Sequence, residues 1–164
     1  MFFNHTIQAM YASGIKSPEI HSIADKISLK IGILFGMYND YSDVYMSEMD
    51  VGHIGTCDIA IGQFTWFVLM AHQLSDPDQR QLLYDNYGRN DDTAVRRVRQ
   101  LYDELDLKAE FRAQESQILD ELYAMIDKFR ETTGLPDTVY AILLADLYRV
   151  KNSVNLNVKV YGNN

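Results

Sequence analysis

The chain has 164 residues, of which 47% are hydrophobic, and its 15 basic and 23 acidic side chains give a formal net charge of −8. This length and composition are typical of one domain with a substantial core. The acidic balance excludes non-specific nucleic-acid binding and attraction to an anionic membrane surface as principal functions. We therefore expect a globular protein whose partners include neither nucleic acid nor a membrane.

The cysteine content and the first residues both bear on the compartment. Cys57 is the single cysteine, so no disulfide can form within the chain, which is typical of a reducing environment. The first residues have neither a basic stretch nor a long apolar segment, and they predict no secretory signal peptide. Together these features predict a cytoplasmic location.

Apolar residues recur at spacings of three and four along most of the chain, which predicts α-helices. Ser17 before Pro18 is a helix start signal, and glycines mark several helix ends. Strand-type alternation appears only weakly, in residues 154–161. The expected fold class is all-α, with one domain over residues 1–151 and a loose tail over 152–164. Helices are expected at about 8–13, 18–45, 58–74, 77–88, 90–105, 107–133 and 136–151.

The second of these helices ends in a polar, acidic cluster, Asn39-Asp40-Tyr41-Ser42-Asp43. At roughly 100° per residue, Asp40 and Asp43 fall nearly opposite the apolar stripe of that helix. A helix with a second face of glycines, apolar residues and acids is expected to be covered by protein on both sides. This pattern predicts a cavity wall with oxygen ligands at its mouth, and the wall residues are Leu29, Gly32, Ile33 and Gly36.

Asp40 and Asp43 are three residues apart, so their side chains project together from the helix. Paired carboxylates at this spacing suit a hard cation such as Mg²⁺, which takes oxygen ligands and often bridges to substrate phosphates. The alternative is an ordinary solvated helix end, and two acids by themselves do not decide between these interpretations.

The order and spacing of several motifs resemble the C-terminal half of the farnesyl diphosphate synthase family, a group of trans-prenyl diphosphate synthases. Each motif is short, but together they extend from about residue 8 to residue 151. The segments that carry the resemblance are Ala9–Ile15, Asn39–Asp43, Gly52–Ile59, Thr65-Trp66, Leu83–Gly88 and Leu101–Leu107.

This resemblance implies the C-terminal portion of an isoprenoid-synthase helical bundle, with about six to seven helices. It also implies an allylic prenyl diphosphate as substrate, Mg²⁺ as cofactor and prenyl transfer to isopentenyl diphosphate. Asp40 and Asp43 would be metal ligands, Asp58 a weaker third ligand, and the face from Leu29 to Gly36 would line the chain-length pocket. Because the family dimerises through helices, a homodimer or pairing with a related chain is expected.

The sequence also departs from the family pattern. Asn39 replaces the first aspartate of the motif and would be a weaker, uncharged metal ligand. His53 and Gln63 replace two lysines that contact diphosphate in the family, and they would be weaker diphosphate contacts. Losing a charge-assisted donor weakens phosphate binding by roughly 1.5–3 kcal/mol each. The region that carries the family's first aspartate motif has no counterpart in this sequence, so the isolated chain is expected to bind Mg²⁺ weakly, to associate and to be inactive alone.

Basic residues late in the chain have no clear place in the predicted site. Arg96, Arg97 and Arg99 are expected to form a solvated face paired with nearby aspartates, and Arg149 and Lys151 are expected to be exposed.

Three functions therefore remain open. The first is part of a prenyl diphosphate synthase, and the second is a terpene synthase that ionises an allylic diphosphate without isopentenyl diphosphate. The third is a non-catalytic chain that pairs with a full-length relative. The loss of both lysines, at positions 53 and 63, suits the second alternative. Because the family dimerises through helices, the resemblance also makes the third physically reasonable.

Overall fold

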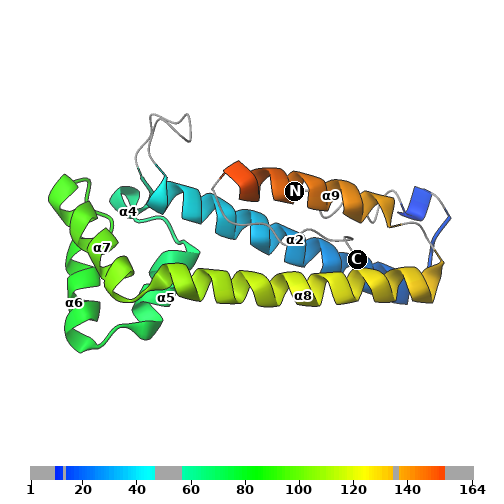
Figure 1. Ribbon diagram of the computed structural model, residues 1–164, viewed down its shortest axis with the longest axis horizontal. Coiled ribbons are helices and arrows are strands. Elements are labelled where there is room, and N and C mark those ends of the chain that lie inside the picture. The colour runs from blue at the N-terminus through cyan, green and yellow to red at the C-terminus, as the bar shows by residue number, and fades with distance from the viewer. Residues whose placement is uncertain (1–9, 13, 47–56, 135–136, 154–164) are drawn as a thin grey trace. The chain divides into compact units, whose positions relative to one another are not determined.

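A computed structural model describes residues 10–12, 14–46, 57–134 and 137–153. Helices are the regular secondary structure of these described ranges, and none of them is long and apolar enough to cross a membrane. The all-α expectation is therefore confirmed. The helices, labelled in Figure 1, are α2 (Pro18–Tyr45), α4 (Asp58–Ile61), α5 (Trp66–Leu74), α6 (Pro77–Asn86), α7 (Asp92–Glu104), α8 (Leu107–Thr133) and α9 (Thr138–Ser153).

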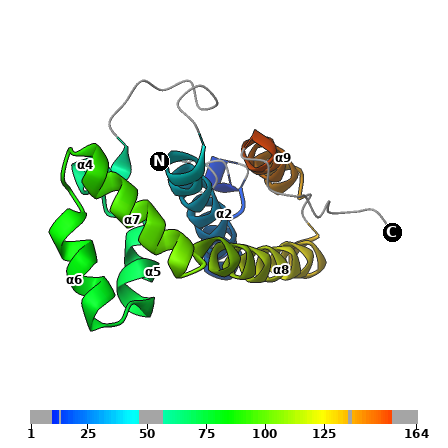
Figure 2. The ribbon, with the colours of Figure 1, turned by 60° about the vertical axis from the view of Figure 1, so that its left-hand side comes forward.

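The chain forms two compact units, one from residues 1–36 and 115–164 and the other from residues 37–114. The boundary between the units falls inside α2 and inside α8. In the first unit, the earlier part of α2, the later part of α8 and α9 lie side by side (Figures 1 and 2). Side chains on the facing stripes are buried, among them Ile27, Ile31, Leu34, Leu122, Ile126 and Leu147.

A buried ion pair joins α8 to α9 in this first unit. The Lys151 ammonium lies 2.9 Å from the Glu115 carboxylate, and the two side chains are only 4% and 8% exposed. The expectation that Lys151 is exposed is therefore wrong, because α9 carries this side chain against α8 rather than into solvent. Arg149 is exposed as expected, and it pairs with Asp146 on the same helix.

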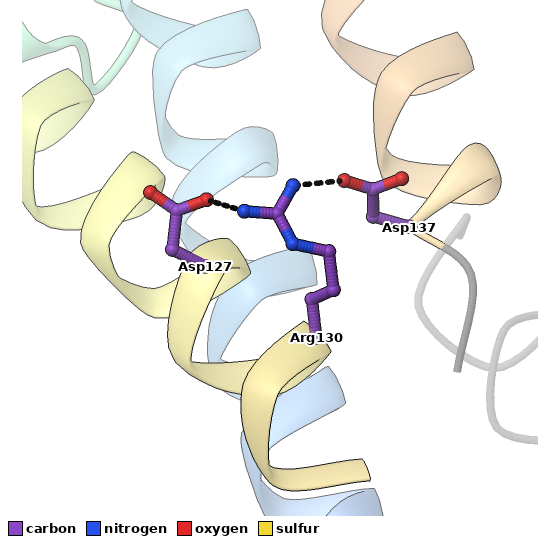
Figure 3. A network of polar contacts seen from close by, with 3 residues as sticks. All are labelled: Asp127, Arg130 and Asp137. Carbon is purple, nitrogen blue, oxygen red and sulfur yellow. Dashed lines mark hydrogen bonds and ion pairs between the residues drawn. The ribbon is translucent and has the colours of Figure 1, made fainter. Parts of the chain in front are cut away.

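A second set of charged contacts lies at the turn between α8 and α9 (Figure 3). The Arg130 guanidinium reaches Asp127 at 2.8 Å, one turn earlier on α8, and Asp137 at 3.4 Å, just before α9. Gly134 ends α8 with a positive φ of 64°, which allows the chain to reverse. Because these charges are largely exposed, they contribute at most about 1 kcal/mol and mainly orient the turn.

Aromatic side chains form the core of the second unit. Phe67 on α5 and Phe111 on α8 stack with ring centroids 5.9 Å apart and planes 5° from parallel. Tyr41, near the end of α2, packs on Phe111 at 4.9 Å, and Tyr102 on α7 lies 5.8 Å from Phe67. The end of α2 is thus held by apolar contacts on the side that faces α5, α7 and α8.

The single helix expected over residues 58–74 is wrong, because the segment contains two helices, α4 and α5. Gly62 ends α4 with a φ of 71° and donates its N–H to the carbonyl of Asp58. Thr65 is extended and begins α5, where its hydroxyl accepts the N–H of Val68 at 3.3 Å. The sequence held both signals, a glycine stop and a threonine cap, inside an apolar run that we expected to be one helix.

The helix predictions from residue 77 onward are confirmed to within two residues, and those for α2 and α8 over their full length. Of the helix expected at about 8–13, residues 10–12 are described and are helical, and its limits lie outside the described residues. Asp76 caps α6 with a complete capping box, as its sequence predicts. The segment between α2 and α4, the alternation at 154–161 and most of the expected tail lie outside the described residues, and the limits of the domain stay a prediction.

The break after α4 also brings two glycines together. A Cβ added to Gly62 would lie 3.2 Å from the Cα of Gly88, and both glycines have positive φ. Gly88 in turn donates its N–H to the carbonyl of Ile59 at 2.9 Å. The two glycines therefore let the ends of α4 and α6 approach with backbone against backbone.

We expect Gly62→Ala to lower the free energy of unfolding by about 1–3 kcal/mol, because it adds positive-φ strain and a contact with backbone. Gly36→Ala is the matched control, since nothing lies within 4 Å of its added Cβ and its place inside α2 favours alanine. It should raise stability by about 0.5–1 kcal/mol. Urea unfolding followed by circular dichroism measures both, and a neutral Gly62→Ala would contradict the close approach.

We expect Lys151→Met to cost about 3–5 kcal/mol, because it removes the ammonium group from a buried carboxylate. Adding Glu115→Leu should restore most of the loss, since no buried charge is then left behind. Arg149→Met, which removes the exposed pair on the same helix, should change stability by no more than about 0.5 kcal/mol. Equal costs at the two positions would show that the Lys151 pair is not buried in solution.

Candidate functional site

The end of α2 carries two of the predicted site residues, and both carboxylates reach the helices that follow. Asp43 Oδ2 accepts the backbone N–H of Asp58, the first residue of α4, at 2.9 Å. Asp40 Oδ2 accepts the backbone N–H of Trp66, the first residue of α5, at 2.7 Å. Because the first N–H groups of a helix lack partners within it, each acid satisfies a free donor and fixes a helix start against α2.

These contacts bring three acidic groups together, Asp40, Asp43 and Asp58. Burial and, after it, the negative charges of Asp43 and Asp40 raise the pKa of Asp58 to about 6. The pKa of Asp40 is also raised, chiefly by burial and in part by Asp43, although the hydrogen bond from Trp66 opposes the rise. The negative charge of Asp43 therefore disfavours the ionisation of Asp40 and Asp58, and a bound cation would relieve that repulsion.

The oxygen donors of Asp40 and Asp43 suit an open metal site better than one enclosed by protein ligands. Among the described residues, no three His, Cys, Asp or Glu side chains converge closely enough to enclose a metal ion. Asp40 and Asp43 each use one oxygen in the hydrogen bond to a helix start and have a second oxygen as well. Mg²⁺ is commonly held by one or two carboxylates together with waters and phosphate oxygens. The residues thus fit an open site shared with a phosphorylated ligand rather than a closed protein cage.

The weaker predicted ligands have different positions. Asn39 is exposed, and its backbone carbonyl accepts the hydroxyl of Ser42 at 2.7 Å. Gln63 is also exposed and lies in the link between α4 and α5, where its carbonyl accepts the hydroxyl of Tyr87 at 2.7 Å. His53 lies outside the described residues. The roles of these three residues in binding remain predictions.

The predicted pocket wall on α2 is exposed among the residues that the structure describes. Leu29 is 55% exposed and Ile33 44% exposed, Gly32 is half-buried, and a Cβ on Gly36 would meet no described atom within 4 Å. The expectation that protein covers both sides of α2 is therefore not met within the described part of this chain. Its opposite stripe is buried as expected, so α2 has one packed face and one open face that is partly apolar.

Sequence reasoning gave no role in the site to two residues that lie beside the acidic group. Tyr87, at the end of α6, has a raised pKa, mainly from burial and also from the charges of Asp58 and Asp40. Arg99 on α7 donates to the backbone carbonyl of Asp43 at 3.4 Å and is partly buried. The signal for Arg99 was its spacing, four residues after Val95 and three before the buried Tyr102, which places it at the edge of the apolar stripe.

The arginine prediction therefore needs a correction. Arg96 and Arg97 are exposed as expected, and they donate to Thr93 and Asn86 rather than to aspartates. Arg99 is not part of that solvated face, because the helix carries it inward against the end of α2.

Comparison with known families matches residues 1–105 to the polyprenyl synthetase family. Farnesyl pyrophosphate synthase of Schizosaccharomyces pombe is 32% identical over 148 residues, which are 90% of this chain and 42% of that protein. Farnesyl pyrophosphate synthase of Homo sapiens is 34% identical over 148 residues, which are 90% of this chain and 35% of that protein. The chain thus spans about two fifths of the length of these curated relatives.

Solved structures give a consistent picture of the fold. A T. brucei farnesyl diphosphate synthase complexed with bisphosphonate is similar with a TM-score of 0.69 and 22% sequence identity. The similarity covers 84% of this chain and 36% of that one. At this identity the likeness concerns the fold alone, which is the all-α fold of these enzymes.

We expect Asp58→Asn to stabilise the folded chain at neutral pH. The pKa of Asp58 in the folded state, about 6, lies above the ordinary value of 3.8, so folding favours the protonated acid. The free energy of unfolding should therefore fall as pH rises from about 4 to about 6, and the neutral amide removes that penalty. Allowing for solvent screening, the midpoint temperature should rise by about 1–3 °C at pH 7.5 and by nothing at pH 3.5.

The matched control is Asp120→Asn, an exposed acid in the middle of α8. Thermal melts of both variants at the two pH values separate a general loss of negative charge from the effect of this cluster. A gain at Asp58 that is the same at both pH values would contradict the burial of its charge.

Proposed function

Because the chain belongs to the polyprenyl synthetase family, we propose that it supplies one wall of an enzyme of isoprenoid biosynthesis. The proposed substrate is an allylic prenyl diphosphate, and the proposed reaction is transfer of its prenyl group to isopentenyl diphosphate. Since the chain spans about two fifths of its relatives, the opposite wall would come from further residues of the same protein or from a second chain.

The observation that supports this proposal most strongly is the grouping of Asp40, Asp43 and Asp58. The motif is similar in sequence to a family motif, and its carboxylates accept hydrogen bonds from backbone amides that hold them in place. Such preorganisation is what a catalytic electrostatic site requires, because no carboxylate must be reoriented when charge develops.

We propose that Asp40 and Asp43 hold Mg²⁺, with Asp58 close by and Asn39 as a weaker oxygen donor. When bound, the metal supplies Lewis-acid stabilisation of the departing diphosphate. The residues of the chain would have two tasks there: the carboxylates would offer oxygens to the cation, and the helix starts at Asp58 and Trp66 would keep those carboxylates oriented.

The diphosphate contacts are weaker than in the family pattern. Gln63 offers an amide instead of an ammonium group, and His53 offers a cation only when it is protonated. Binding of the diphosphate should therefore depend more strongly on the metal here than in relatives that have both lysines.

The prenyl chain would lie along the open face of α2. Gly36 and Asp40 are four residues apart and share a side of the helix, and Ile33 and Leu29 continue that side toward its start. An apolar face of this kind needs a cover, which agrees with a second wall that completes the pocket.

Two alternatives each have an observation in their favour. The neutral Gln63 favours a terpene synthase, which needs metal-assisted ionisation but no isopentenyl diphosphate. The exposure of Leu29 and Ile33 favours a non-catalytic chain that pairs with a full-length relative through this face.

Turnover of the purified chain with Mg²⁺ and geranyl or farnesyl diphosphate tests all three functions, with and without isopentenyl diphosphate. We expect little product from the chain alone, and chain-extended diphosphate once the first half of a farnesyl pyrophosphate synthase is added. Because each acid is proposed to hold the metal, Asp40→Asn with Asp43→Asn should lower that rate by about 100-fold or more.

Controls and contrary outcomes follow from the same assay. Asp120→Asn on α8 should leave the rate unchanged. Terpene alcohol or hydrocarbon formed without isopentenyl diphosphate would establish the terpene-synthase alternative. If the two proteins are folded and their mixture forms no product, the proposed enzymatic function is wrong. A non-catalytic chain that pairs with a full-length relative is then the remaining function.

A further inference from the structure

We propose that Arg99 on α7, assisted by Lys108 on α8, is a positioning residue that holds the last turn of α2 in place for cation binding. This inference rests on the proposed function, in which Asp40 and Asp43 hold the cation. It concerns two basic side chains that do not themselves contact the ligand.

The end of α2 carries excess negative charge that no basic residue of its last turn balances. The last carbonyls of a helix have no partners within it, and they form the negative end of the helix dipole. The last turn of α2 contains no basic residue, yet it carries Asp43, with Asp40 one turn earlier. Two carboxylates at the negative end of a helix repel both that end and each other, so compensation has to come from other helices.

Arg99 provides the first part of that compensation. One of its terminal nitrogens donates to the backbone carbonyl of Asp43 at 3.4 Å, which places a permanent positive charge on the final turn. Its Nε is buried and has no hydrogen-bond partner among the residues that the structure describes. The guanidinium is therefore partly buried, and its hydrogen bond to the Asp43 carbonyl joins it to α2.

Lys108 on α8 provides the second positive charge, and it contacts Tyr45, two residues after Asp43 on α2. Its ammonium lies 4.2 Å from the centre of the Tyr45 ring, the last residue of the helix, and 3.5 Å from the Asp103 carboxylate. A cation over an aromatic face is attracted to it, so Lys108 fastens the ring that ends α2. The turn that carries Asp43 is thus bounded by one basic side chain from α7 and one from α8.

The charge of Arg99 and its effect on the position of the turn should change cation affinity in opposite directions. The direction in which the affinity changes when Arg99 is replaced therefore tests the proposal. A positive guanidinium near the carboxylates repels an incoming cation, so a purely electrostatic Arg99 would weaken binding. A guanidinium that keeps the turn and its carboxylates oriented strengthens binding. Removing the charge therefore tightens cation binding in the first case and weakens it in the second.

The test uses the full chain and Mn²⁺ alone, with free Mn²⁺ measured by electron paramagnetic resonance. We expect Arg99→Met, which keeps most of the side-chain length, to weaken Mn²⁺ binding about three- to tenfold. Arg99→Lys should recover part of the loss because it restores a donor for the carbonyl. Lys108→Met should weaken binding by a smaller factor, and Arg96→Met, an exposed arginine on the same helix, should leave it unchanged. Unchanged or tighter binding in Arg99→Met would overturn the proposal.

Hydrogen exchange without metal provides a second readout. The amides of Asp58 and Trp66 are protected by the carboxylates of Asp43 and Asp40. Arg99→Met should speed exchange at both amides several-fold, whereas the amide of Gln79, protected by Asp76 at the start of α6, should be unaffected. Unaltered exchange at Asp58 and Trp66 would overturn the positioning role, even in a well-folded variant.

The two readouts also separate this inference from the proposed function. If Asp40→Asn with Asp43→Asn leaves Mn²⁺ binding unchanged, the cation site is wrong and the proposed function fails. The exchange rates in Arg99→Met still decide whether Arg99 holds the turn.

Discussion

Two hydrogen bonds, each donated by a backbone amide to a carboxylate, organise the second unit of this chain. Asp43 accepts the first N–H of α4, and Asp40 accepts the first N–H of α5. The first N–H groups of two helices lack acceptors within their own helices, and the two carboxylates near the end of α2 accept both of them. The break between α4 and α5, with its glycine stop and threonine cap, is what allows both starts to reach α2.

The same carboxylates therefore have a structural and an electrostatic role. One oxygen of each acid is used to hold the following helix, and the charge of each acid raises the pKa of Asp58. A cluster of acids that repel one another suits a cation as ligand, and the same acids fix the starts of two helices. The proposed cation binding is compatible with this structural role, because a carboxylate has two oxygens and Mg²⁺ needs only one from each.

Much of the fold could be predicted from local patterns. The apolar stripe of α2, the capping box of α6 and the length of α8 all follow from helical periodicity and terminal signals, and all three are confirmed. The continuous helix over residues 58–74 was wrong, because its apolar content outweighed Gly62 and Thr65 in our interpretation. Lys151 was also misplaced, since a single charged residue near a chain end gives no local signal of the carboxylate that it meets on α8.

The sequence by itself determined the fold class, the identity of the acids on α2 and their spacing, because these depend on residues a few positions apart. Only the tertiary structure decided which groups those acids contact. The hydrogen bond that the amide of Trp66 donates to Asp40 spans 26 residues, and the one that Arg99 donates to the carbonyl of Asp43 spans 56. Such pairs depend on how helices pack and on where a chain turns, and no periodicity within one helix carries that information. The burial that raises the pKa of Asp58 arises in the same way, because it requires neighbours from several helices at once.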